Sequence, residues 1–374
     1  MIHVEANWQP ALGDIGICWA ELAIESPGNP FLSDAWLMPW FERIAVGHQP
    51  VLVRIVDGHG LVAFGVLHRA EIRRRGLFKR TQLYLNEYPL GDHHMVIEYN
   101  GLVCRRGCQA AAWTALMQWL MTAYPQWDEC CFNAIEPDQT PAIAHAAAAA
   151  GLVCLIEKCQ RAPYGDLCER HWHDVERMNL SSNRRRQIRR AMTLYREQYG
   201  EVSLRPIVAR EEFADFWRSM AECHASVWEA RGCRGAFANP VWLDFNRALC
   251  LAGLADGTAQ LLRITAGEMP IGYLYNLVAG AQVFNIQSAF RYESDNRLKP
   301  GFVCHYLAMQ FCHGAGLQKY HYLGGGEDYK ASLSAREDWL TWLVVRKRPG
   351  RFLVEDFVVA VVRVLRGWFG RAPG

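Results

Sequence analysis

The order in which strands and helices are predicted along the chain occurs twice, and this repetition constrains the fold more than any other feature of the sequence. In the first half we expect strands at residues 51–56 and 61–68, then a basic loop, and then a strand at 95–99, a helix at 108–123 and a strand at 130–134. Tight glycine turns between alternating apolar runs are typical of an antiparallel meander, and the helix and strand that follow add a parallel or mixed part.

The second half repeats this order. Strands are expected at residues 260–265, 271–278 and 283–289, followed by a helix at 302–313 and a strand at 319–323. The sequence thus predicts two copies of one α/β (α+β) unit, each with its own mixed, mainly antiparallel sheet. We expect the corresponding domains at residues 1–165 and 166–350, and an amphipathic helix at 351–374.

An arginine-rich segment separates the two halves. Ser and Asn side chains at 179–183 can cap a helix that ends at Gly200, and the outer face of this helix is basic, with Arg184, Arg185, Arg186, Arg189 and Arg190. The planar guanidinium group matches phosphate oxygens, so this face suits a phosphate or another polyanion; the alternative is an ordinary solvated helix face. A net charge of only +2 and the lack of a reader motif argue against nucleic acid.

In the segment 351–374 apolar residues recur at helical spacing: Val354, Phe357, Val358, Val361, Val362 and Leu365. Charged residues such as Glu355 and Arg363 interrupt the apolar run, so a membrane span is not expected. The helix either packs on the core of the protein or contacts a membrane surface peripherally through residues 351–371.

The thirteen cysteines are scattered and include no CxxC pair, which favours the reducing environment of the cytoplasm. Cys104 and Cys108 lack the second pair of ligands that a structural zinc site needs, so we expect no metal. The first ten residues do not have the basic segment and apolar run of a signal peptide, and we expect none.

Candidate catalytic residues follow the last strand of the second half. A glycine turn at 324–326 delivers Glu327, Tyr329 and Lys330 to the exit of the strand, where open α/β sheets bind their substrates. The alternative is a loop that only covers the sheet edge. His321, within the strand, titrates near neutral pH and could act as a base, or it could point into the core, because alternate residues of a strand share a face.

A second candidate site lies where the preceding helix begins, at Lys299, Pro300 and Gly301. Pro suits the first helical turn, and the free N–H groups and the positive end of the helix dipole suit an anion such as a pyrophosphate. The chain has no GxSxG, GxxxxGK or HExxH motif and no GxGxxG after a strand, so serine hydrolases, P-loop proteins, zincins and Rossmann folds lack support.

Taken in order, the motifs of the second half resemble a known family. Lys299-Pro300-Gly301 before a helix, the residues 316–320 before a strand, the turn at 323–325, and Tyr329-Lys330 with Trp342 beyond resemble the C-terminal module of GNAT-superfamily acyltransferases of the CelD-like, cellulose-biosynthesis-associated type. The resemblance implies tandem GNAT folds, as in the related Fem-type aminoacyltransferases, with acyl-CoA as the donor.

The resemblance also implies roles for individual residues. A splayed strand pair holds the donor's pantetheine in GNAT folds, which implies the donor contacts Ile286, Gln287, Ser288 and Ala289, beside Lys299, Pro300 and Gly301 at the pyrophosphate. Tyr329 would protonate the leaving thiolate, and Lys330 would hold a phosphate or a carboxylate of the acceptor. The family usually has Asp at the positions of His321 and Gly326, so this chain needs another base, either His321 or Glu327.

Three functions stay open at this point. The first is a CoA-dependent N- or O-acyltransferase that moves an acyl group, expected to be acetyl, to a small-molecule or glycan acceptor such as a sugar, an amine or an envelope polysaccharide precursor. The second is a Fem-type aminoacyltransferase that uses aminoacyl-tRNA, which the arginine-rich helix favours. The third is an inactive module that binds a glycan or a partner, which the missing Asp favours.

Overall fold

The computed structural model of the protein describes residues 2–22, 28–44, 50–74, 78–88, 96–233, 235–325 and 328–347. Glu327 and the amphipathic helix expected at 351–374, with its membrane contact, lie outside the described residues.

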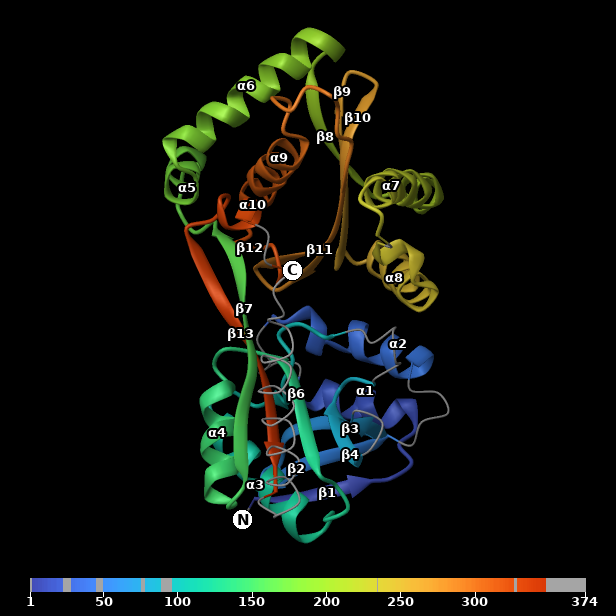
Figure 1. The fold of residues 1–374 in the computed structure, drawn as a ribbon, viewed down its shortest axis with the longest axis vertical. Helices are drawn as coiled ribbons and strands as arrows, with labels where there is room; N and C mark the ends of the chain where they lie inside the picture. The colour runs from blue at the N-terminus through green and yellow to red at the C-terminus, as the bar shows by residue number, and fades with distance from the viewer. Residues whose placement is uncertain are drawn as a thin grey trace, which may run out of the picture.

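The structure consists of two units with the same order of elements (Figure 1). The first unit contains β1 (His3–Asn7), α1 (Leu12–Leu22), α2 (Asp34–Ile44), β2 (Val51–Asp57), β3 (Gly60–Arg74), β4 (Phe78–Leu85), α3 (Gln109–Thr122), β6 (Glu129–Ile135), α4 (Thr140–Ala149) and β7 (Val153–Asp166). It also has two short additions, the 3-10 helix η1 (Pro30–Leu32) and the strand β5 (Val103–Cys104).

The second unit repeats the list. It contains β8 (Val202–Ile207), α7 (Arg210–Ala230), α8 (Pro240–Gly253), β9 (Ala259–Ala266), β10 (Met269–Ala279), β11 (Gln282–Phe290), α9 (Pro300–Gly314), β12 (Lys319–His321), α10 (Asp328–Ala331) and β13 (Arg336–Arg346), with the 3-10 helix η3 (Ala236–Ala238) before α8. The repeated α/β order predicted from the sequence is confirmed. Two helices without a counterpart in the first unit, α5 (Trp172–Asn179) and α6 (Ser182–Tyr199), connect the units.

The strands of both units form one continuous hydrogen-bonded sheet, in the order β1-β2-β3-β4-β6-β13-β7-β12-β11-β10-β9-β8. Two long strands join the units: β7 pairs with β12 of the second unit, and β13 from the end of the described chain pairs with β6 of the first. Figure 1 shows β7 and β13 running side by side between the units. The expectation of two separate sheets is therefore wrong, whereas the mixed, mainly antiparallel character is confirmed, since only the β4–β6 and β11–β12 strand pairs are parallel.

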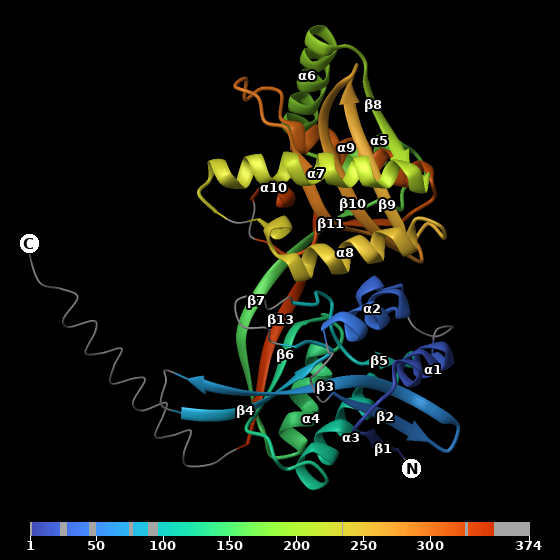
Figure 2. The same ribbon diagram turned by 90° about the vertical axis from the view of Figure 1, so that its right-hand side faces the viewer.

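The strand that follows β3 in the first unit is β4, and not the strand expected at residues 95–99. Met95 lies outside the described residues, and the chain after it forms no strand; Asn100 makes only a single bridge to Ile135. Figure 2 shows that β3 and β4 extend as a hairpin beyond the rest of the sheet. The sequence of this extension is rich in charged residues, such as Arg73, Lys79 and Arg80, so it lacks the alternation by which we identified the other strands.

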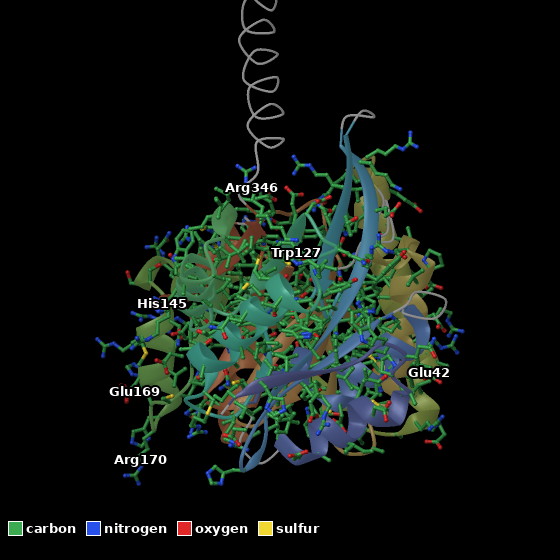
Figure 3. The ribbon with its side chains drawn as sticks, turned by 90° about the horizontal axis from the view of Figure 1, so that it is seen from below. Glu42, Trp127, His145, Glu169, Arg170 and Arg346 are labelled. Atoms are coloured by element: carbon green, nitrogen blue, oxygen red, sulfur yellow. The ribbon has the colours of Figure 1, made fainter. Side chains whose placement is uncertain are left out.

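The helices cover both faces of the sheet and enclose three main cores. One core lies between the units, where Trp36 of α2 packs edge-on against Phe245 of α8 with ring centroids 4.8 Å apart. A second lies under α3 and α4, where the buried Trp127 donates from Nε1 to the Leu120 carbonyl; in Figure 3 Trp127 is labelled near the middle of the view and Glu169 and Arg170 at its edge. The third lies between the sheet of the second unit and α5, α6 and α9.

Over the ranges that the structure describes, no helix is both long and apolar enough to cross a bilayer.

Candidate functional site

Strands β11 and β12 pair over only three residues and then diverge. Gln282, Val283 and Phe284 pair in parallel with Lys319, Tyr320 and His321, while the rest of β11 continues along β10. From residue 285 onward, the edge of β11 that faces β12 has no strand partner within the described chain. Backbone N–H and C=O groups on such an edge are available to a ligand.

A cavity of about 450 Å³ lies against this free edge. It is bounded by β11, the turn after β12, the helix α10, the C-terminal half of α7 and one residue of the first unit. The lining includes Ile286, Gln287, Ser288, Ala289, Phe290, Tyr322, Gly324, Tyr329, Lys330, His224, Trp228, Arg231 and Glu98. The predicted donor contacts 286–289 and the predicted catalytic residues Tyr329 and Lys330 are thus brought together in one cavity.

A β-bulge shapes the free edge of β11. Tyr275 pairs with Gln287 and Asn276 pairs with Asn285, so Ile286 has no partner on β10. The buried Asn285 side chain holds the bulge: its Nδ2 donates to Asn276 Oδ1 at 2.9 Å, and its Oδ1 accepts from Ser288 Oγ at 2.7 Å. An extra residue bends a strand and re-aims its backbone, which explains why β11 turns away from β12 here.

The predicted pyrophosphate residues stand next to the cavity and not in its lining. Helix α9 begins at Pro300, as expected, and Lys299 takes the left-handed conformation at φ +47° before it. Gly301 packs against the ring of Phe290, which does line the cavity; a Cβ at Gly301 would lie 3.3 Å from that ring. The role of Lys299, Pro300 and Gly301 stays a prediction.

Tyr329 and Lys330 come from α10, a single turn of helix beside the start of α9. The Tyr329 ring packs at 6.4 Å from the ring of Phe302 and at 6.2 Å from that of His305. Lys330 donates from Nζ to the carbonyl of Gly324 at 3.2 Å, which fixes the ammonium group at the glycine turn. Both residues thus reach the cavity from one short helix, and their catalytic roles stay predictions.

His321 lies in the interior, away from the cavity. Its side chain is 2% exposed and stacks on Phe284 with ring centroids 4.2 Å apart. Nε2 is 2.8 Å from Gln282 Oε1, and Nδ1 is 3.1 Å from the hydroxyl of Tyr99. Burial, helped by the charge of Lys319, lowers the pKa of His321 to about 3. The alternative of a buried core histidine fits this geometry, and a catalytic base does not.

Glu98 is the carboxylate that we did not foresee in the site. It comes from the first unit, and its Oε2 accepts from the backbone N–H of Gly324 at 2.6 Å. Burial raises the pKa of Glu98 and outweighs the hydrogen bond from Gly324 and the charges of Lys330 and Lys158, which lower it. A carboxylate whose pKa is raised is a better proton acceptor near neutral pH.

A second cavity of about 680 Å³ adjoins the first along α7. Val227, Arg231 and Tyr292 line both cavities, so the two form a continuous depression. The second cavity adds charged groups from both sides, with Glu222 on α7 and Arg291 just after β11. The cavity is large enough for a small molecule, and its mixed lining offers these charged groups beside apolar ones.

Comparison with known families shows which proteins this region of the chain is similar to. Residues 182–331 match the family described as Acetyltransferase (GNAT) domain. The chain contains a GNAT-type acetyltransferase domain. Matching the domain to the structure shows that it runs from α6 to α10 and contains both diverging strands, but it ends before β13 and does not include Glu98.

Solved structures extend the GNAT likeness of the fold to both units. The structure of FemX has a TM-score of 0.60 at 11% identity and covers 91% of this chain and 96% of its own. The C-terminal domain (DUF2156) of a putative lysylphosphatidylglycerol synthetase from Agrobacterium fabrum has a TM-score of 0.53 at 10% identity, covering 94% and 97%. L-PGS from Bacillus licheniformis has a TM-score of 0.50 at 12% identity, covering 92% and 95%.

These likenesses at low identity concern the fold, and they confirm the tandem GNAT-like architecture. No curated protein sequence matches the chain significantly. The CelD-like subgroup and the domain boundaries at 165/166 and 350/351 stay predictions.

The described residues contain no group of three or more His, Cys, Asp or Glu side chains arranged to hold a metal ion. Each of the thirteen cysteines is a free thiol.

Proposed function

We propose that the protein transfers an acyl group from acyl-CoA to an amine or hydroxyl group in the cavity between β11 and β12. One observation carries the proposal: the free edge of β11 faces Glu98, Tyr329 and Lys330 across a single cavity. A donor held along a strand edge and an acceptor held next to it would react in register, which by itself is worth several kcal/mol.

In the proposed reaction the acceptor's nitrogen or oxygen attacks the thioester carbonyl carbon. Glu98 takes the proton of the acceptor, the carbon–sulfur bond breaks, and Tyr329 gives a proton to the departing thiolate. The backbone of residues 286–289 would bind the amide groups of the pantetheine arm. The N–H groups of the site would stabilise the charge that develops on the carbonyl oxygen.

We place the acceptor in the adjoining cavity, between Glu222, Arg231 and Arg291. A carboxylate and two guanidinium groups suit an acceptor that carries hydroxyl or amino groups together with an anionic group, such as a charged sugar. A sugar or an envelope polysaccharide precursor is our proposed acceptor, and acetyl is the proposed acyl group. We propose the cytoplasm as the location, since acyl-CoA and free thiols are compatible there.

A Fem-type aminoacyltransferase is the second candidate. The fold is similar to that of FemX, with a TM-score of 0.60, and an aminoacyl-tRNA donor would bring an RNA to the same domain. A module that only binds a glycan or a partner is the third, and it would need no reactive donor at all.

Binding of the donor tests the proposal directly. We expect acetyl-CoA and CoA to raise the melting temperature, because a ligand at a hundred times its Kd stabilises the native state by about 2.7 kcal/mol. Transfer is then followed by release of CoA thiol in the presence of amino sugars and other small amines. Absence of any shift with CoA, acetyl-CoA and longer acyl-CoAs would sink the CoA hypothesis.

The role of Tyr329 is tested by Tyr329→Phe, which keeps the ring contacts with Phe302 and His305. A general acid contributes about a hundredfold or more, so kcat should fall by about that factor while the affinity for CoA is unchanged. A variant with the turnover of the wild type would remove Tyr329 from the mechanism.

A further inference from the structure

Helix α6 has no counterpart in the first unit, yet it lies directly beside the start of α9. The guanidinium group of Arg184 stacks on the ring of Phe302, 3.7 Å from the ring centroid. Phe302 belongs to the first turn of α9, and its ring in turn packs against Tyr329 of the cavity. The first turn of α6 is thus separated from the donor cavity by one aromatic ring.

The outer face of α6 presents a shallow depression of about 570 Å³, lined by Ser182, Asn183, Arg186, Arg189, Arg190 and Thr193. The loop between β11 and α9 approaches this face through Asp295, and Arg297 of the loop is paired with Asp295 at 2.6 Å. Arg190 lies near enough to Asp295 of this loop to help lower its pKa to about 2, although the main cause is the hydrogen bond from Arg297. The positive charge of this depression therefore comes from the arginines of α6.

Much of this positive charge is not neutralised. Among the described residues, no carboxylate lies within ion-pair distance of Arg186, Arg190 or Lys299, whereas Arg189 is 3.9 Å from Glu176. Helix stability does not account for the arrangement. Positive charges near the N-terminus of a helix oppose its dipole, and α6 has no acidic residue in its first turn. A binding role explains why the arginines stand at this end.

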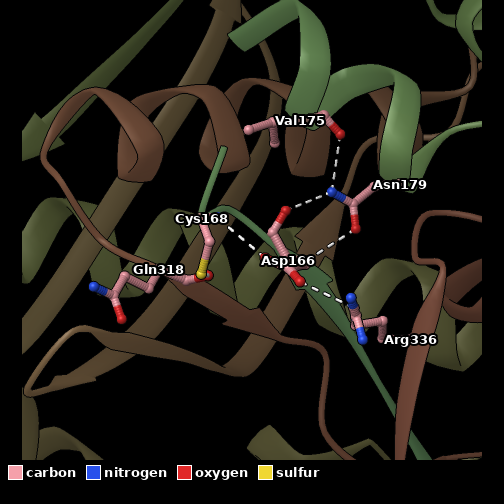
Figure 4. A network of polar contacts seen from close by, with 6 residues as sticks. All are labelled: Asp166, Cys168, Val175, Asn179, Gln318 and Arg336. Atoms are coloured by element: carbon pink, nitrogen blue, oxygen red, sulfur yellow. Dashed lines mark hydrogen bonds and ion pairs between the residues drawn. The ribbon is translucent and has the colours of Figure 1, made fainter. Parts of the chain in front are cut away.

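The start of α6 is held firmly in place (Figure 4). Asn179, just before it, donates from Nδ2 to the Asp166 carbonyl at 2.7 Å and accepts from the Asp166 N–H at 2.9 Å. The carboxylate of Asp166 pairs with Arg336 at the start of β13. Arg185 donates to the Leu180 carbonyl at 3.2 Å. The basic face is therefore fixed to the same strands, β7 and β13, that join the two units.

We propose that the first half of α6 binds the phosphate groups of the donor's nucleotide. This inference rests on the proposed function, because it takes CoA as the donor. In particular, Arg186 and Arg190 hold the 3′-phosphate and the diphosphate, while the pantetheine arm enters the cavity along β11. Both arginines belong to α6, a helix outside the repeated unit.

The length of the basic stretch favours a nucleotide over RNA. From Arg184 to Arg190 the helix rises about 9 Å, which is the size of one nucleotide with its phosphates. Beyond this stretch the helix carries Glu197, and Arg196 is paired with Glu201 at 2.8 Å. A surface that follows an RNA backbone would continue the positive charge over several phosphates.

Isothermal titration with CoA, 3′-dephospho-CoA and pantetheine tests the inference. We expect the double variant Arg186→Gln/Arg190→Gln to bind CoA at least about tenfold more weakly, since a charged hydrogen bond lost to phosphate is worth about that factor. Pantetheine should bind to the variant as it does to the wild type. Arg196→Gln on the same helix is the matched control and should leave all three affinities within about twofold.

The outcomes separate the inference from the proposed function. Wild-type affinity for CoA in the folded double variant, as judged by circular dichroism, overturns the inference and leaves the function standing. Loss of binding to a tRNA acceptor-stem hairpin, with CoA affinity unchanged, makes α6 an RNA site and also overturns it. A wild-type protein that binds neither CoA nor acetyl-CoA removes the proposed function itself.

Discussion

In each unit two parallel strands pair over three residues and then diverge: β4 and β6 in the first unit, β11 and β12 in the second. We call the place where the two strands diverge the fork, and it is closed in the first unit and open in the second. In the first unit Gln82, Leu83 and Tyr84 of β4 pair in parallel with Glu129, Cys130 and Cys131 of β6. In the second, Gln282 to Phe284 of β11 pair in the same register with Lys319 to His321 of β12. Only the second fork opens into the cavity that contains the candidate site.

In the first unit the protein's own chain fills the fork. Asn100 donates from Nδ2 to the Leu85 carbonyl at 2.9 Å and accepts from Asn86 Nδ2 at 3.0 Å, while its backbone bridges to Ile135 of β6. The backbone groups that a donor would need are thus already bonded. The comparison indicates that the first unit supports the site of the second. The segment that contains Asn100 closes the fork of the first unit, and the same segment places Glu98 at the fork of the second.

The largest expected effect concerns the closed fork. Arg80 and Glu129 form a buried ion pair there, and Gln82 donates to the same carboxylate at 2.8 Å. Glu129→Ala would leave Arg80 buried without this partner, so the free energy of unfolding should fall by about 3–5 kcal/mol. Urea denaturation measures the change.

The open fork supplies the control for this prediction. Lys319 occupies the register position of Glu129, is half-buried, and lies over the ring of Tyr164 at 4.8 Å. Lys319→Ala should cost no more than about 1 kcal/mol. Equal losses in the two variants would contradict the idea that the forks differ in how they are closed.

The second prediction tests whether the first unit serves the second. Glu98→Gln keeps the size of the side chain and an acceptor for the Gly324 N–H, but it removes the proton acceptor. We expect kcat to fall by about a hundredfold or more, with the CoA affinity unchanged. In the wild type kcat should also fall as the pH drops through the raised pKa of Glu98, and this limb should vanish in the variant.

Glu136→Gln is the matched control, because Glu136 also has a raised pKa but lines neither of the two cavities. Its kcat and pH profile should stay those of the wild type. A low-pH limb that persists in Glu98→Gln would assign the base to another group.

The third prediction concerns a variant that removes hydrogen bonds from the closed fork of the first unit. Asn100 is fully buried, and Asn100→Ala leaves the Leu85 carbonyl and the Asn86 amide without it, which should lower the free energy of unfolding by about 1–3 kcal/mol. Because Glu98 belongs to the same segment, kcat should fall several-fold even well below the melting temperature. Asn246→Ala in α8 removes a buried Asn that bonds the Trp242 carbonyl, and it should lose stability without losing kcat. Equal kcat values in the Asn100→Ala and Asn246→Ala variants would show that the closed fork does not position the site.

The sequence predicted what local patterns determine. The meander at 259–290, the start of α9 at Pro300 and the cap of α6 by Ser181, which accepts from the Arg184 N–H, all depend on neighbouring residues. The meeting of 286–289 with Tyr329 and Lys330 could be predicted because β11 and β12 are consecutive strands of one unit. The resemblance to GNAT proteins then gave these residues their expected roles.

What could not be predicted depends on contacts distant in sequence. Glu98 and Gly324 are 226 residues apart, and no periodicity relates them. The joining strands β7 and β13 are long and partly exposed, so neither has a clean alternation, and their pairing merges the two sheets. The sequence left the orientation of the His321 side chain open, because its neighbours Tyr320 and Tyr322 lie on the opposite face of the strand. The structure shows that Tyr99 and Gln282, both distant in sequence, enclose the His321 ring.

The smallest expected effect is a dependence of stability on pH that arises from Glu136 in the first unit. Glu136 follows β6 and accepts from Asn29 Nδ2 at 3.0 Å, and burial raises its pKa from the usual 4.5 to about 7. A carboxyl whose pKa is higher in the folded than in the unfolded state binds its proton more tightly when folded, so stability is greatest below about pH 4.5 and decreases as the pH rises towards 7. The half-buried side chain is partly screened by water, which limits the change to the order of 1 kcal/mol. Glu136→Gln has no charge to bury and should lose this decrease, which denaturation midpoints at pH 5 and pH 8 would reveal as a smaller difference than in the wild type. An unchanged difference would mean that other groups, outside the closed fork, set the pH dependence in this range.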